Sequence, residues 1–270
     1  MKVGFIGAGN MAGAIIQGMV TSGHSKGEDI CCFDVDKDKT KALAEQCGVV
    51  ACPSNEALVE ASDLVVLAVK PLLIEPVLTE VKDLIVKRRP LIVSIAAGTT
   101  IPKIESILGK DGGVPVVRVM PNLNVMVGEG MSAVCGNAAA GAEGTRLAQG
   151  IFDAVGRTVE IAEKDFSVFT AIAGSAPAFV FLFIDALARG GVKNGLPKQM
   201  ADRIAAQAVL GSAKTVLQGE ESPWGLIDKV CSPGGTTVAG LMALEDQAFL
   251  STVVKGVEAA IARDREMMKQ

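Results

Sequence analysis

Short β-branched runs alternate with helical patterns along the first part of the chain. The strands that this pattern predicts cover residues 3–6, 30–33, 64–69, 91–95 and 114–119. Each run lies next to a segment in which apolar residues recur at helical spacing. Because consecutive parallel strands need a crossover helix between them, the alternation predicts an α/β fold with a parallel sheet.

The pattern changes near residue 160. From Asp165 to Gln270 strand-like alternation is almost absent, and long segments rich in Ala, Leu, Val and Met are broken by turns with glycine and proline. We therefore expect two domains, 1–162 with the sheet and an all-helical 163–270. The 270 residues, 49% of them hydrophobic, are enough for two cores.

Charge and composition argue against several classes of protein. A net charge of −4 without a basic block argues against a nucleic-acid partner. The six cysteines form no C-x-x-C pair and His24 is the single histidine, so we expect no metal. Asn10 interrupts the first apolar stretch and the phenylalanine-rich run ends at Asp185, so we expect no signal peptide and no membrane span. These features predict a soluble cytoplasmic protein.

A glycine-rich loop, Gly7-Ala8-Gly9-Asn10-Met11-Ala12, follows the first predicted strand and opens a helix. Gly7 would allow the tight turn, Gly9 would let the backbone approach a pyrophosphate, and Ala12 would permit close helix packing. The helix N-terminus would then present its N–H groups to the phosphates. A plain turn could contain the same residues, but the position between strand and helix favours dinucleotide binding.

Asp34 stands at the end of the second predicted strand, where a carboxylate can accept hydrogen bonds from the adenosine ribose. It would repel a 2′-phosphate, whereas Lys37 and Lys39 could pair with one. A solvated turn of mixed charge explains the two lysines as well, and we favour that interpretation. The cofactor is therefore NADPH or NADH, and we expect NADH to be used at least as well.

Three further loops follow predicted strands: AVKP at 68–71, SIAAG at 94–98 and VMPN at 119–122. Ligands of open parallel sheets bind at these strand ends, so the loops are suited to a nicotinamide and a small substrate. Ordinary turn chemistry would also explain each loop taken singly. Lys70 is the residue among them that is least expected in a simple turn.

The segment CSPGGTTVAGL, residues 231–241, leads into a helix of the second domain. Its glycines would expose consecutive backbone N–H groups, Thr236 and Thr237 carry hydroxyls, and the helix start adds a positive dipole end. Together these groups could hold a carboxylate. A helix cap without a ligand is the alternative, and the residues alone do not decide between the two.

The chain resembles the pyrroline-5-carboxylate reductase family in a series of motifs that runs over nearly its whole length. They are FIGAGNMA, AVKP, SIAAG, MPN, AGSAPAFVFLFIDAL, GLP, AAQAVLGSAK and CSPGGTT, in that order. The resemblance implies a Rossmann-type N-terminal domain and an all-α dimerisation domain. It implies NAD(P)H-dependent reduction of 1-pyrroline-5-carboxylate to L-proline, the last step of proline synthesis. It also implies a homodimer or a larger assembly of dimers.

The resemblance also assigns site residues. Cofactor contacts would fall on Ile6, Gly7, Ala8, Gly9, Asn10, Met11, Asp34, Asn55, Ala68, Val69, Lys70, Pro71, Ala96, Ala97 and Gly98. Substrate contacts would fall on Ser232, Gly234, Gly235, Thr236, Thr237 and Glu220. Backbone N–H groups would hold the carboxylate and the Thr237 hydroxyl would lie near the ring nitrogen. We assign catalytic roles to Thr237 and Lys70.

Some residues depart from the family pattern. Ala176 replaces a common glycine, Phe179 replaces a common tyrosine, and the chain contains no tyrosine. A phenol therefore cannot serve as the proton donor, and positioning of an imine protonated before or during binding would supply most of the catalysis.

Two other functions share features with this sequence. A β-hydroxyacid dehydrogenase would need a catalytic lysine that GSAPAFVFLFIDALARGG lacks. A nucleotide-sensing module without enzymatic activity would be expected to have lost the glycine loop or the carboxylate loop, and both are present. The sequence therefore favours reduction of an imine.

Overall fold

The computed structural model describes residues 1–109 and 113–268. By packing, these residues divide into two compact units: residues 1–174 with the end of the chain from Ile261, and residues 175–260. The division predicted after residue 162 lies before the boundary between these two compact units, because the fully buried Phe166 packs into a core of the first unit. The functional division into 1–162 and 163–270 stays a prediction.

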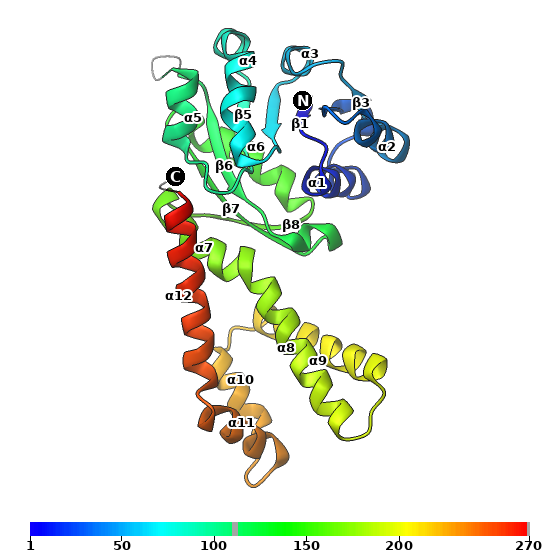
Figure 1. The fold of residues 1–270 in the computed structure, drawn as a ribbon, viewed down its shortest axis with the longest axis vertical. Coiled ribbons are helices and arrows are strands. Elements are labelled where there is room, and N and C mark those ends of the chain that lie inside the picture. Colours follow the sequence, from blue (N-terminus) through cyan, green and yellow to red (C-terminus); the bar gives the residue numbers. More distant parts are fainter. Residues whose placement is uncertain (110–112, 269–270) are drawn as a thin grey trace. The chain divides into compact units, whose positions relative to one another are not determined.

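An eight-stranded sheet forms the centre of the first unit (Figure 1). Its spatial order is β3-β2-β1-β4-β5-β6-β7-β8. The strands are β1 (Val3–Ile6), β2 (Ile30–Phe33), β3 (Val50–Ala51), β4 (Leu64–Leu67), β5 (Leu91–Ser94), β6 (Val116–Met120), β7 (Gly130–Gly136) and β8 (Gly156–Glu160). The five strands predicted from the sequence are all present, and β3, β7 and β8 were missed.

The first six strands are parallel, but β7 pairs with β6 in the antiparallel direction and β8 is parallel to β7. The sheet is therefore mixed, which corrects the expectation of a wholly parallel one. Only nine residues separate β6 from β7, which is too short for the crossover that a parallel neighbour needs. The N-terminal Rossmann-type arrangement is confirmed.

Helices cover both faces of this sheet (Figure 1). The helices on one face are α1 (Asn10–Thr21), α2 (Lys37–Cys47) and α6 (Gly141–Asp153). The helices on the other face are α3 (Asn55–Ala61), α4 (Ile74–Arg88) and α5 (Ile101–Leu108). The strands β1, β4 and β5 are buried along their whole length, as expected for strands covered on both sides.

The second unit is helical, as predicted. Its helices are α8 (Ala176–Lys193), α9 (Lys198–Gln218), α10 (Pro223–Val230), α11 (Thr236–Asp246) and the first part of α12 (Phe249–Met267). The short helix α7 (Phe166–Phe169) and a π-helical turn, Thr170–Ser175, precede α8. Large apolar side chains of α8 are exposed in the single chain, among them Phe181 at 54% and Leu182 at 70%.

One helical run in the described residues, Glu163–Lys193, is long and apolar enough to cross a membrane by length and composition. Its most apolar window has a mean hydropathy of 2.0 and is 17% buried. No membrane span was expected from the sequence, because the phenylalanine-rich run ends at Asp185. Core helices of soluble proteins meet the same criterion, so the feature does not itself indicate a membrane.

Candidate functional site

The carboxyl ends of four parallel strands lie next to one another at one edge of the sheet. Ile6, the last residue of β1, is in register with Phe33 of β2 and Leu67 of β4. Leu67 is in turn in register with Ser94 of β5. The residues that follow these strands are the glycine loop, Asp34, the 68–71 loop and the 95–98 loop. Open parallel sheets bind nucleotides at this edge, so the structure groups most of the predicted cofactor residues where a dinucleotide would lie.

The glycine loop has the backbone geometry that a dinucleotide requires. Gly7 has a φ of +101°, and a Cβ placed on it would lie 2.7 Å from the carbonyl oxygen of Ala68. The backbone conformation and the lack of space each exclude a side chain at this position. Gly9 precedes α1, and a Cβ placed there would meet none of the described atoms within 4 Å. Asn10 and Met11 begin α1, which has neither a side-chain cap nor an acidic residue in its first turn. Its first N–H groups are therefore suited to an anion.

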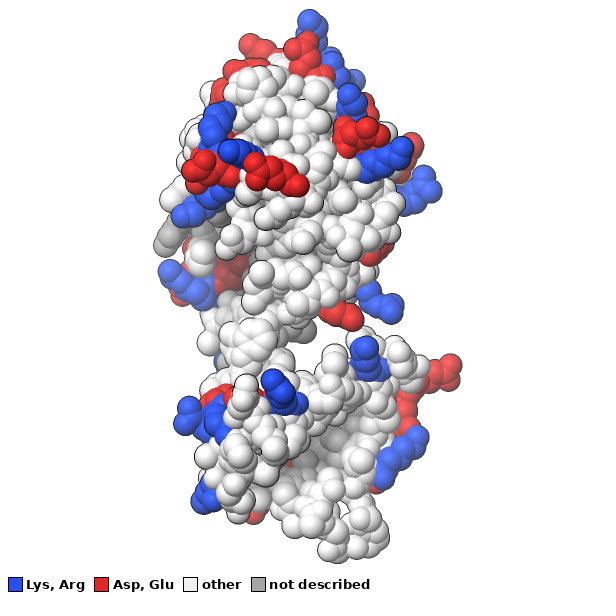
Figure 2. All heavy atoms as spheres, turned by 90° about the vertical axis from the view of Figure 1, so that its right-hand side faces the viewer, with Lys and Arg blue, Asp and Glu red and all other residues white. Residues whose placement is uncertain are grey.

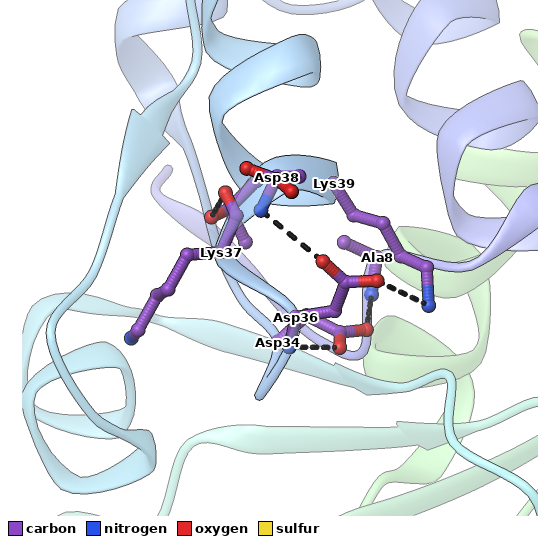
Figure 3. Close-up of polar contacts among 7 residues, drawn as sticks. Ala8, Asp34, Asp36, Lys37, Asp38 and Lys39 are labelled. Atoms are coloured by element: carbon purple, nitrogen blue, oxygen red, sulfur yellow. Dashed lines mark hydrogen bonds and ion pairs between the residues drawn. The ribbon is translucent and has the colours of Figure 1, made fainter.

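Asp34 holds the glycine loop against the turn that follows β2 (Figure 3). Its Oδ2 accepts a hydrogen bond of 2.8 Å from the Ala8 N–H, and its Oδ1 accepts one of 2.9 Å from the Asp36 N–H. Each carboxylate oxygen retains a second lone pair, so the group can still accept from ribose hydroxyls. Asp34 is not paired with Lys37 or Lys39.

The two further predicted cofactor loops start from β4 and β5. The Ala68 N–H donates to the Ile6 carbonyl at 2.8 Å, Val69 packs on the core, and the exposed Lys70 precedes a 3₁₀-helix, Pro71–Leu73. In the other loop Ala96 is buried, Ala97 is exposed and Gly98 has a φ of +71°. Their exposed atoms border the same sheet edge as Gly9.

The 119–122 loop was expected to take part in ligand binding, but its asparagine has a structural role. The Asn122 Nδ2 donates to the Ala173 carbonyl at 3.0 Å. The Asn122 Oδ1 accepts from the N–H groups of Asn124 and Met131. With its amide engaged on both sides, Asn122 positions the chain between β6 and β7.

Asn55 begins α3, just after β3, and is 94% buried. Its Nδ2 donates to Glu80 Oε2 of α4 at 2.9 Å, and its Oδ1 has no hydrogen-bond partner among the described residues. A carboxylate can accept only from the amino side of the amide, so Glu80 fixes the orientation of Asn55. The Glu80 contact was not predicted, because nothing in an exposed helical glutamate indicates a partner 25 positions away.

The predicted substrate loop lies in the second compact unit, between α10 and α11. Gly234 has a φ of +67°, and the Gly235 N–H is used within the loop, donating to the Ser232 carbonyl at 3.0 Å. The N–H groups of Gly234, Thr236 and Thr237 donate to no other group among the described residues. Glu220 is exposed in the turn before α10, and its neighbour Glu221 makes the ion pair with Lys229.

Cys32 lies on β2, two residues before Asp34. Burial, together with the nearby Cys31 and Asp34, raises the pKa of Cys32 to about 11, so this thiol stays protonated at neutral pH. Within residues 1–109 and 113–268 no three His, Cys, Asp or Glu side chains form a group that could hold a metal ion.

Two family models match the chain. Residues 163–267 match the model described as pyrroline-5-carboxylate reductase dimerisation, and residues 2–98 match NADP oxidoreductase coenzyme F420-dependent. Both matches fall within the predicted domains to which their descriptions correspond.

Relatives and solved structures match nearly the full length. The chain is 38% identical to the pyrroline-5-carboxylate reductase of Escherichia coli K12 over 99% of this chain and 98% of that protein. It is 39% identical to the Arabidopsis thaliana enzyme, over 98% and 95%. The Coxiella burnetii structure has a TM-score of 0.93 at 35% identity, covering 98% of both chains. The Plasmodium falciparum structure with NADP bound has a TM-score of 0.87 at 34% identity, covering 99% and 98%.

Proposed function

This chain belongs to the pyrroline-5-carboxylate reductase family, and from that premise we propose how its own residues carry out the reaction. The predicted activity, reduction of pyrroline-5-carboxylate by an NAD(P)H-dependent oxidoreductase, is confirmed by the full-length relatives. The roles of individual residues, the cofactor preference, the assembly and the compartment remain proposals. The observation that carries the proposed cofactor site is the row of strand ends that groups the glycine loop with Asp34, Lys70 and Gly98.

The described residues fit a nicotinamide dinucleotide. Open space in front of Gly9 and the uncapped start of α1 suit a pyrophosphate, and Asp34 retains acceptor capacity for the adenosine ribose. The loops at 68–71 and 96–98 would flank the rest of the cofactor, with Asn55 on the adenosine side. When bound, the reduced nicotinamide supplies the hydride for C5 of the imine.

The loop from Ser232 to Thr237 would bind the substrate carboxylate. Its N–H groups at Gly234, Thr236 and Thr237 are the available donors, whereas that of Gly235 maintains the turn. The Thr237 hydroxyl, in the first turn of α11, would lie by the ring nitrogen, and Glu220 would lie nearby. The Lys70 ammonium would support the negative charge of the cofactor.

Reduction adds one hydride to C5 and one proton to nitrogen, which gives L-proline. The chain has no tyrosine, and His24, its single histidine, is exposed after α1. An imine protonated in solution or on binding needs no buried acid, so orientation by the carboxylate loop would supply most of the rate enhancement.

The helical unit would associate with a second copy of the chain. The match to a dimerisation model indicates self-association, and the exposed side chains of α8 are an apolar surface of the kind that such contacts cover. Figure 2 shows few charged side chains in the middle of this unit on the face drawn. We propose a homodimer, or a larger assembly of dimers, located in the cytoplasm.

Spectrophotometry tests the proposal directly. Loss of NADPH or NADH absorbance should depend on added pyrroline-5-carboxylate, and reduction should be faster than proline oxidation near neutral pH. Tight cofactor binding without turnover would instead support the nucleotide-sensing alternative.

A further inference from the structure

The two lysines of the turn after β2 have different partners. The Lys37 ammonium lies 4.5 Å from the centre of the Phe33 ring. The Lys39 ammonium lies 3.3 Å from Asp36 Oδ2. Figure 3 shows Lys39 extending toward the side on which Ala8 and Asp34 lie, and Lys37 pointing away from it. Of the two, Lys39 is therefore the cation on the side of the glycine loop.

Asp36 is itself held in place by the backbone. It is the N-cap of α2, and its Oδ1 accepts from the Asp38 N–H at 3.2 Å. Its own N–H donates to Asp34 Oδ1, and Asp34 in turn accepts from the Ala8 N–H. A continuous set of contacts thus links the glycine loop, through Asp34 and Asp36, to Lys39.

We propose that Asp36 is a specificity-determining residue for the cofactor, because it holds Lys39 in an ion pair and withholds it from a 2′-phosphate. The turn then presents the Asp34 carboxylate, without a free cation beside it, to the adenosine ribose. This arrangement favours a ribose with an unsubstituted 2′-hydroxyl, as in NADH. The inference rests on the proposed binding of NAD(P)H at the glycine loop.

The charge of the turn supports this direction. Residues 34–39 carry three carboxylates against two ammonium groups, so the segment repels a phosphate unless a lysine is released from its partner. The Lys39 and Asp36 side chains are 50% and 46% exposed, so the ion pair is weak and a single substitution can release the lysine.

Asp36→Asn is the appropriate test variant. Asparagine caps a helix as well as aspartate does, so the change removes the ion pair and preserves the start of α2. Asp38→Asn is the matched control, because it removes the same charge from the same turn without touching Lys39. Asp36→Ser, another good cap, provides a second test if the first variant folds poorly.

Calorimetry on the protein without cofactor should compare 5′-AMP with 2′,5′-ADP (adenosine 2′,5′-bisphosphate), which differ only in the 2′-phosphate. Asp36→Asn should raise the affinity for 2′,5′-ADP, relative to that for the nucleotide without the 2′-phosphate, by about three- to tenfold. This is the effect expected when one released lysine contacts a phosphate. Asp38→Asn should change this relative affinity by less than about twofold, because its charge is screened by solvent. Adding Lys39→Met to Asp36→Asn should abolish the gain, and raising the salt concentration should reduce it.

Equal shifts in the Asp36 and Asp38 variants would overturn the proposal, since charge alone would then explain them. It would also fail if the unaltered protein already bound 2′,5′-ADP about tenfold more tightly than 5′-AMP. If neither nucleotide bound, the cofactor site and this proposal would both be wrong. The expected shifts without any imine turnover would uphold the proposal and refute only the proposed function.

Discussion

Replacing Glu163 by alanine should destabilise the protein more than replacing its partner Arg118 by methionine. The Arg118 Nη1 lies 3.0 Å from Glu163 Oε1, and the same oxygen accepts from the Ile101 N–H at 2.8 Å. The Arg118 side chain is 4% exposed, whereas that of Glu163 is 26% exposed. The guanidinium also lies 4.5 Å from the centre of the Phe166 ring. The pair thus joins β6 and the start of α5 to the first residue of the helical run.

The magnitudes follow from the unequal burial. Glu163→Ala leaves a buried guanidinium without a counter-charge, which costs about 3–5 kcal/mol. The unpaired Ile101 N–H adds about 1 kcal/mol. Arg118→Met leaves a carboxylate that water can reach and that still accepts from Ile101, while methionine can pack on the Phe166 ring. We expect this variant to lose about 1–2 kcal/mol.

Urea unfolding should be followed by circular dichroism and by the fluorescence of Trp224. Trp224 lies in the second unit and the ion pair in the first, so coincident transitions are needed before a single free energy of unfolding is assigned. Glu163→Gln, which keeps a neutral acceptor, should fall between the unaltered protein and Glu163→Ala. Equal losses in the alanine and methionine variants, or the reverse order, would refute the argument from unequal burial.

Three further predictions concern the proposed site and assembly. Asp34→Ser should shift the ratio of kcat/KM values toward NADPH by about tenfold, the equivalent of about 1.4 kcal/mol of relieved repulsion. Both cofactors should bind less tightly, because the contact with Ala8 is lost. A strong NADPH preference in the unaltered enzyme would contradict this interpretation of the turn. Thr237→Ala should cost imine reduction on the order of 1 kcal/mol with the cofactor dissociation constant unchanged, and unaltered kinetics would remove the residue from the site. Light scattering at micromolar concentration should give at least a dimer, whereas a fully active monomer would contradict the proposed role of α8.

The part of the fold that could be predicted is the part with strong local periodicity. Strands buried on both faces, such as β4 and β5, form continuous apolar runs that can be recognised without tertiary information. The missed strands lack this signal: β3 has two exposed residues, β7 begins and ends with glycine, and β8 is partly exposed throughout. Pairing with a neighbouring strand, rather than local sequence, determines these three.

The position of the glycine loop could be predicted because its residues are adjacent in sequence and their backbone requirements are specific. The contacts that complete the site could not, because they join distant positions: Ala8 with Asp34, and Asn55 with Glu80. For a similar reason the sequence does not indicate that Phe166 packs with the sheet, since only tertiary packing buries it there.

Isotope transfer most directly tests whether this chain passes a hydride from C4 of the nicotinamide to C5 of the imine. Reduced cofactor carrying deuterium at C4, in the position that is transferred, should be incubated with the enzyme and pyrroline-5-carboxylate, and the proline analysed by NMR. One deuterium per molecule of proline, bound at C5, is the expected result. Proline without deuterium at C5, or no proline despite bound cofactor, would contradict it.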